Sequence, residues 1–119
     1  MAICSTLNLP NEPIFKRLIE NNKTISNVII NDPTCDVEAG YSRLLHDIVA
    51  LRQELYEALP GTLFDHGVIR PDSPYILVQS PGNYEFIVAC FAVLAFGGAV
   101  VPIGMTFPAV LTDFIVGHV

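Results

Sequence analysis

The residues that could bind a phosphate group lie in one short segment of the chain. Nucleotide-binding proteins place a glycine-rich turn before a helix, so that several backbone N–H groups point at the anion. Neither of the two common patterns, GxGxxG and GxxxxGK[ST], occurs in these 119 residues. The nearest segment, Ser80-Pro-Gly-Asn83, contains one glycine and a proline that has no N–H. We therefore interpret it as a strand-to-helix turn rather than as an anion site.

Histidine and serine side chains could act as general bases, nucleophiles or metal ligands. His46, His66 and His118 are scattered along the chain, form neither an HxxxH nor an HxH pair, and have no cysteine nearby at zinc-binding spacing. Ser80 precedes a proline and does not occur in the GxSxG pattern of serine hydrolases. The sequence therefore predicts that the three histidines face solvent and that Ser80 is not a nucleophile.

Carboxylates and thiols complete no site either. Asp47, Glu54 and Glu57 fall near one face of a predicted helix, which is typical of a solvated surface. Cys90 lies in an apolar run, where a thiol usually behaves as a small hydrophobe. We predict no catalytic, cofactor-binding or metal-binding residue and no cofactor for this chain. The three cysteines, which form no CxxC pair, are Cys4, Cys35 and Cys90.

Composition narrows the class of protein. The chain is 51% hydrophobic and 15% charged, which excludes disorder, collagen and coiled coil. A net charge of -6 argues against a nucleic-acid partner, because phosphate binding requires clustered Lys and Arg. The odd number of cysteines and the absence of a signal-peptide pattern at the N-terminus predict an intracellular, cytoplasmic protein.

A long uncharged run raises the question of a membrane span. All six Lys and Arg residues lie in the first 70 positions, and residues 86–112 carry no formal charge. Glycines and prolines interrupt this run, so a continuous helix is predicted only for residues 83–96, about 21 Å long at 1.5 Å per residue. The hydrocarbon core of a bilayer is about 30 Å thick. We therefore predict a buried helix and a buried strand, and no membrane span.

Apolar spacing predicts two helices and a hairpin in the first half of the chain. Residues 12–21 form a helix with Asn11 as its N-cap, and residues 41–59 form a longer amphipathic helix that is expected to lie on a sheet. Between them, residues 26–31 are predicted as a strand, and the spacing allows residues 35–38 to pair with it. Residues 62–73 are predicted as a connector because they contain turn residues.

The sequence pattern of the second half of the chain predicts a βαβ unit. Residues 75–80 form a buried strand, residues 84–96 a helix that is apolar nearly all round, and residues 99–103 a second strand. Such a unit crosses over right-handed and makes its strands parallel, and its helix must be covered on both faces. Gly97-Gly98 is interpreted as the helix C-cap. The fold class is α/β and layered, and residues 1–119 are expected to be a single, partial domain.

The end of the chain carries a last predicted element. Residues 107–119 have the apolar spacing of a helix that begins but has no closing turn. This incomplete pattern favours the interpretation that the chain is truncated.

The stretch from Tyr75 to Met105 resembles the N-terminal region of the AMP-binding superfamily, the adenylate-forming enzymes that include acyl-CoA synthetases. In that family a hydrophobic strand ends in a PNS.EF turn, and the following helix and strand resemble V.A.LA...AGG and VPL.P. The corresponding segments here are Pro81-Gly-Asn-Tyr-Glu-Phe86, Ala92-Val-Leu-Ala-Phe-Gly-Gly98 and Val100-Val-Pro-Ile103. Upstream, Gly40-Tyr-Ser-Arg-Leu-Leu45 is similar to the TY.EL entry into the family's first long helix.

The resemblance has clear departures from the family pattern. Pro71 stands where the family has the glycine of a GD pair, and Gly82 intrudes into the turn. The family's phosphate loop (TSGTTG.PKG), adenine-contacting motif, ribose-binding Asp and catalytic Lys have no counterparts among these residues. For a full-length relative the resemblance implies ATP, Mg and CoA as cofactors and a carboxylic acid that is activated through acyl-AMP. We therefore hypothesise that this chain is the N-terminal fragment of such a ligase and is inactive alone.

A second hypothesis belongs to a different class of protein. The charge-poor C-terminal segment is also compatible with a naturally short, non-catalytic module that binds a partner or dimerises, because large uncovered apolar surfaces mark interfaces. In either case, residues 86–112 are expected to be covered, by the remaining part of the enzyme or by a second copy in a homo-oligomer.

Overall fold

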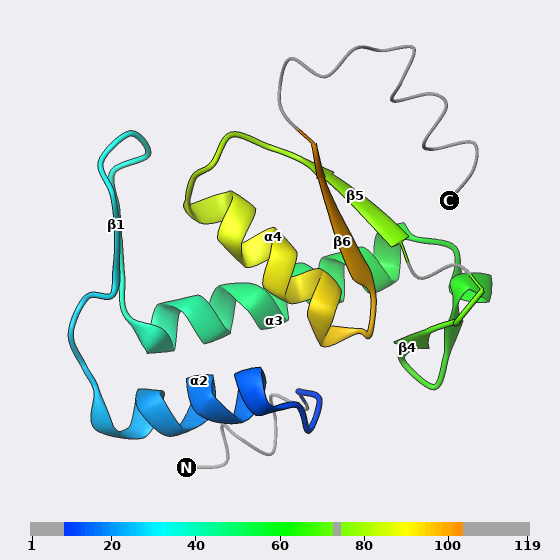
Figure 1. Ribbon diagram of the computed structural model, residues 1–119, viewed down its shortest axis with the longest axis horizontal. Helices are drawn as coiled ribbons and strands as arrows, with labels where there is room; N and C mark the ends of the chain where they lie inside the picture. Colours follow the sequence, from blue (N-terminus) through cyan, green and yellow to red (C-terminus); the bar gives the residue numbers. More distant parts are fainter. Residues whose placement is uncertain (1–8, 73–74, 104–119) are drawn as a thin grey trace.

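The protein combines helices with short strands in one chain. A computed structural model describes residues 9–72 and 75–103 (Figure 1). The elements follow in the order α2 (Pro13–Thr24), β1 (Ile30–Asp32), β2 (Val37–Ala39), α3 (Tyr41–Ala58), a 3₁₀ helix (Gly61–Leu63), β3 (Phe64–Asp65), β4 (Val68–Ile69), β5 (Tyr75–Gln79), α4 (Tyr84–Ala95) and β6 (Ala99–Ile103). This mixture of helix and strand is compatible with the predicted α/β class.

The predicted βαβ unit is confirmed. Strands β5 and β6 are parallel, in a register that pairs Tyr75 with Ala99 and Gln79 with Ile103. Strand β5 ends one residue before the predicted 75–80, and α4 also ends one residue before its predicted end. In Figure 1, α4 lies between α3 and the β5–β6 sheet, so both of its sides are covered as its composition requires.

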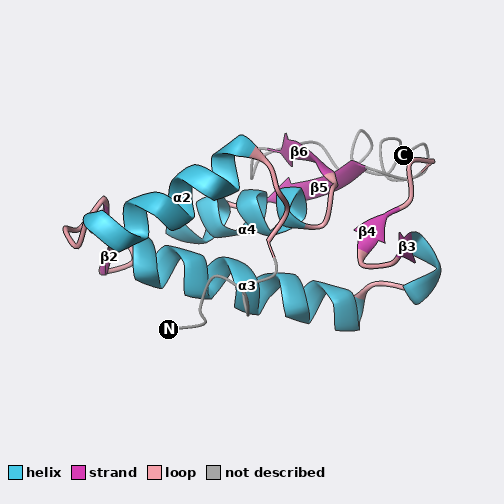
Figure 2. Ribbon diagram, turned by 90° about the horizontal axis from the view of Figure 1, so that it is seen from below, coloured by secondary structure: helices cyan, strands magenta, loops and turns pink. Residues whose placement is uncertain are grey.

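Two apolar clusters hold these elements together. The first joins α2, α3 and α4, which lie side by side in Figure 2, and its fully buried side chains include Phe15, Leu44 and Ile48. The second lies at the C-terminal end of α4, where Val93 and Phe96 are buried against β4 and the sheet. Helix α4 belongs to both clusters and is therefore the central element of the described fold.

The C-terminus of α4 has the predicted glycine cap. Gly97 has φ +83°, a left-handed conformation that favours glycine. The N–H of Gly97 donates to the carbonyl of Leu94 (3.0 Å), and the N–H of Gly98 donates to that of Val93 (3.0 Å). These two bonds form a Schellman motif, which satisfies the last carbonyls of the helix and turns the chain into β6.

The first half of the chain differs from the prediction at element ends. Helix α2 has Glu12 rather than Asn11 at its N-cap, and it extends to Thr24 rather than to residue 21. Asn21 does not end the helix because its side chain donates to the Tyr41 hydroxyl (3.1 Å) and its carbonyl accepts from the N–H of Ile25 (2.7 Å). The strand predicted at 26–31 spans only Ile30–Asp32, and the predicted hairpin with β2 is confirmed.

Helix α3 confirms the amphipathic helix predicted at 41–59, but it does not lie on a sheet as expected. It packs mainly against α4 and α2 rather than directly on the sheet, because α4 is itself apolar enough to be buried between them. Residues 62–73, predicted as a connector, include the antiparallel pair β3–β4. The helix predicted at 107–119 lies outside the described residues. Within the described ranges, no helix combines the length and the apolar character that crossing a membrane requires.

Candidate functional site

The segment Ser80–Asn83 lies where β5 leads into α4, as predicted, and its helix end is already occupied by side chains. The Asn83 side-chain oxygen accepts from the N–H of Phe86 (3.0 Å), which is an N-cap bond. A carboxylate oxygen of Asp32 accepts from the N–H of Tyr84 (2.9 Å). Two of the helix's free N–H groups therefore bind carboxylate and amide oxygens of this chain, and they do not point at an open anion site.

Asp32 is the residue that sequence reasoning missed. It is only 9% exposed, and its second carboxylate oxygen accepts from the Thr34 hydroxyl (2.6 Å) and from the Thr34 N–H (3.2 Å). The Thr34 hydroxyl, followed by the Tyr84 N–H, lowers the pKa of the Asp32 carboxyl below its ordinary value of 3.8. The spacing Asp-x-Thr is a local signal for this turn, but the bond to Tyr84 crosses 52 positions and leaves no signal in the sequence.

We expect Asp32→Asn to lower the unfolding temperature at pH 7. We also expect the unfolding temperature of this variant to fall less than that of the wild type as the pH is lowered. Because the pKa of Asp32 is lowered on folding, the carboxylate stabilises the fold above its unfolded pKa, and this contribution is lost as the pH falls through the folded value. Thermal unfolding followed between pH 7 and pH 2 measures both effects. Asp36→Asn in the same exposed turn is the control, and an equal response of the two variants would contradict the assignment.

A second polar contact joins α3 to the first residue of α4. The Tyr84 hydroxyl donates to a carboxylate oxygen of Asp47 (2.7 Å), and Arg43 forms an ion pair with the same oxygen (3.5 Å) and lies over the Tyr84 ring (5.4 Å from its centre). Burial raises the pKa of Tyr84 above its ordinary value of 10.0, and the Asp47 carboxylate raises it further. Asp47, predicted on a solvated face, is therefore a partly buried hydrogen-bond acceptor, whereas Glu54 and Glu57 are exposed.

We expect Tyr84→Phe to destabilise the fold by about 1.5–3 kcal/mol at neutral pH, the range for losing one hydrogen bond to a charged group. The wild-type phenol stays protonated in the folded state after its unfolded counterpart ionises, so stability present below pH 10 is lost as the pH rises above it. Tyr84→Phe should flatten this alkaline decrease. Urea unfolding at pH 8 and at alkaline pH tests it, and an unchanged alkaline slope would contradict the buried-phenol interpretation.

The predicted histidines and cysteines do not come together. His66 is 96% exposed and lies 3.4 Å from Asp65, and His46 is exposed on α3. Cys35 is exposed, while partial burial raises the pKa of the Cys90 thiol. Among residues 9–72 and 75–103, no three His, Cys, Asp or Glu side chains are placed to hold a metal ion. His118 and Cys4 lie outside the described residues.

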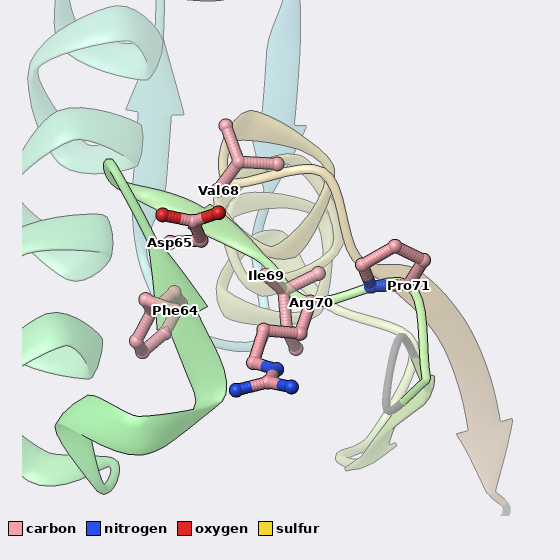
Figure 3. A pocket seen from close by; sticks show the side chains of 6 residues that line it. All are labelled: Phe64, Asp65, Val68, Ile69, Arg70 and Pro71. Atoms are coloured by element: carbon pink, nitrogen blue, oxygen red, sulfur yellow. The ribbon is translucent and has the colours of Figure 1, made fainter.

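A depression of about 660 Å³ lies on the β3–β4 hairpin (Figure 3). Figure 3 shows the Asp65 carboxylate and the Arg70 guanidinium pointing in different directions. Arg70 is instead paired with Asp72 (3.5 Å). With the two charges apart and Phe64, Val68 and Ile69 along the rest of its wall, the depression brings no nucleophile and base together.

The described part of the chain is thus a mixed helix and strand fold, and the polar side chains at the N-terminal end of α4 bind other groups of the same chain. Comparison with known proteins shows which proteins the chain is related to. The chain is 41% identical over 93 residues to the acyl-CoA ligase OryP of Aspergillus oryzae, a match that covers 76% of this chain and 16% of that protein. The chain therefore has an acyl-CoA ligase-like, adenylate-forming relation, and the match spans about a sixth of the length of this curated relative. No family model and no solved structure matches the chain.

Proposed function

We propose that this chain is the N-terminal part of an ATP-dependent acyl-CoA ligase that activates a carboxylic acid through an acyl-adenylate. The observation that carries the proposal is the 41% identity to an acyl-CoA ligase along three quarters of the chain. The ordered turn, helix and strand motifs of residues 81–103 support it, because they coincide with the βαβ unit.

In this proposal the chain contributes to the fold of the enzyme and does not contribute catalytic or cofactor-binding residues. ATP, Mg and CoA are cofactors of the longer polypeptide. In support, the α4 N–H groups of Tyr84 and Phe86, which could otherwise bind a phosphate, already bind Asp32 and Asn83. The apolar segment 86–112 is covered by the remaining part of the enzyme, and the site of action is the cytoplasm. The 119 residues alone are inactive.

We expect no ATP–pyrophosphate exchange by the 119-residue chain with a panel of aliphatic and aromatic carboxylic acids. The physical reason is that neither a phosphate loop nor a catalytic lysine in its motif occurs in the sequence. Measurable, carboxylate-dependent exchange would contradict the assignment of this chain to a purely architectural role.

The direct test of the proposed function is a chimera. The matched segment of the Aspergillus ligase is replaced by the corresponding residues of this chain, and formation of acyl-CoA from that ligase's own substrate is measured. We expect a folded, active chimera, and we expect the same chimera with Gly97→Ala to lose most of its activity because the α4–β6 turn is strained and destabilised. A folded chimera without activity would contradict the proposal.

A further inference from the structure

A groove with a volume of about 450 Å³ lies between α3 and the first turns of α4. Helix α3 contributes the residues between Arg43 and Glu54 that line it, a length of about 16 Å at 1.5 Å per residue. The apolar part of the lining consists of Val37, Ala50, Leu51 and Val88. The groove is therefore long enough to take about three turns of a further helix.

The groove carries an excess of negative charge. It is lined by three carboxylates and one guanidinium, which leaves a net charge of -2. Arg43 is paired with Asp47 (3.5 Å), so the excess belongs to Glu54 and Glu85. Both of these side chains are exposed, and neither forms an ion pair within the described ranges.

Local helix effects account for only one of these two carboxylates. Glu85 lies in the first turn of α4, where the helix dipole stabilises negative charge. Glu54 lies in the C-terminal half of α3, where the dipole gives no such stabilisation. Alanines stand four positions before and after Glu54, so its own helix supplies no cation to pair with it at that spacing. A cation from outside the chain is therefore the complementary partner for this side chain.

We propose that this groove docks an amphipathic helix of a separate protein, with apolar side chains on its inner face and Lys or Arg on its two flanks. Helices bind grooves of this kind through apolar residues at i, i+3 or i+4, and i+7. These residues lie against Leu51 and Val88, and the flanking cations pair with Glu54 on α3 and Glu85 on α4. The exposure of the two carboxylates favours an exchanging partner, because permanent interfaces are more hydrophobic, whereas charges at a rim steer association.

A synthetic peptide of leucine and lysine in this helical pattern is the probe, and a peptide with glutamate in place of lysine is its control. Calorimetry measures the binding of each peptide to the 119-residue chain. We expect only the lysine peptide to bind, and we expect Glu54→Gln combined with Glu85→Gln to weaken its binding about fivefold through the loss of two exposed ion pairs.

Glu20→Gln combined with Glu57→Gln is the matched control for this double variant. It removes the same charge from two exposed residues that do not line the groove, and we expect it to leave the affinity nearly unchanged. Equal losses in the two double variants would show that only the net charge of the chain matters. That result, or binding of the glutamate peptide, would overturn the proposal.

A pair of neutral substitutions tests the position of the docked helix. Ala50 and Ala58 are both exposed on α3, but only Ala50 lines the groove. We expect Ala50→Gln to weaken binding of the lysine peptide by obstructing the groove and Ala58→Gln to leave it unchanged, with thermal unfolding showing that both variants are folded. Equal affinities of the two variants would place the peptide elsewhere and overturn the proposal.

The chimera described above distinguishes a separate protein from the ligase's own polypeptide. We expect the lysine peptide to bind the active chimera with an affinity similar to that for the free chain, because the groove stays open in the longer protein. Loss of binding in an active chimera would show that the remaining ligase polypeptide covers the groove. It would overturn the assignment to a separate protein and leave the proposed function standing.

Discussion

Replacing Phe96 with alanine is expected to lower the free energy of unfolding by about 3–5 kcal/mol, the range for truncating a fully buried aromatic side chain. Phe96 is 0% exposed, and its ring packs edge-on against Phe64 (5.3 Å between ring centres) and at a tilt against Tyr56 (6.0 Å). Its carbonyl also accepts from the N–H of Ile69 (2.8 Å). One side chain therefore joins α3, the β3–β4 hairpin and the end of α4.

The size of this effect compares with the whole stability of a small domain. Single domains are stable by about 5–15 kcal/mol, so Phe96→Ala should remove a large part of the stability of the chain. Urea unfolding followed by circular dichroism measures it. Leu94→Ala is the matched control, because Leu94 lies two positions earlier and is 38% exposed, and it should cost less than about 1 kcal/mol. Equal costs for the two variants would contradict the central place given to Phe96.

The same ring explains why the β3–β4 hairpin was missed from the sequence. Its strands have two residues each and depend on the long-range contact of Phe64 with Phe96, which no local pattern records. A local signal did exist: His66 and Gly67 have φ of +54° and +81°, the two left-handed residues that a tight hairpin turn requires. The segment Asp-His-Gly-Val contains the glycine at the expected place, but histidine is a weak indicator of that conformation.

Helix α3 and the βαβ unit were predictable because their signals are local. Leu44, Leu45 and Ile48 repeat at the helical period, and the uncharged strands flank a helix that ends in two glycines. The candidate site is harder to predict from the sequence. Asp32 lies just beyond the strand predicted at 26–31, and its role depends on Tyr84, which lies far along the chain. Sequence patterns thus predict most of the elements, whereas the β3–β4 hairpin and the polar contacts between elements require the structure.

Replacing Gly97 with alanine is expected to destabilise the fold by about 2–5 kcal/mol, from two separate causes. Gly97 has φ +83°, and a side chain in the left-handed region costs about 1–2 kcal/mol. The added Cβ would also lie 2.9 Å from a methyl carbon of Val68, and overpacking of this kind costs about 1–3 kcal/mol. Both costs fall on the turn that leads α4 into β6, so they weaken the parallel pairing as well as the helix end.

Two further variants separate these causes. Gly82→Ala is the control, because Gly82 has no neighbouring atom within 4 Å of the added Cβ and no left-handed φ, and it should be nearly neutral. Val68→Ala in the Gly97→Ala background removes the close contact but leaves the backbone strain. After the cost of Val68→Ala alone is subtracted, it should recover only part of the lost stability, and the shortfall measures the strain. Full recovery would show that the positive φ carries no cost. No recovery would show that Val68 is not the obstacle, and the Schellman turn alone would then explain why glycine is required between α4 and β6.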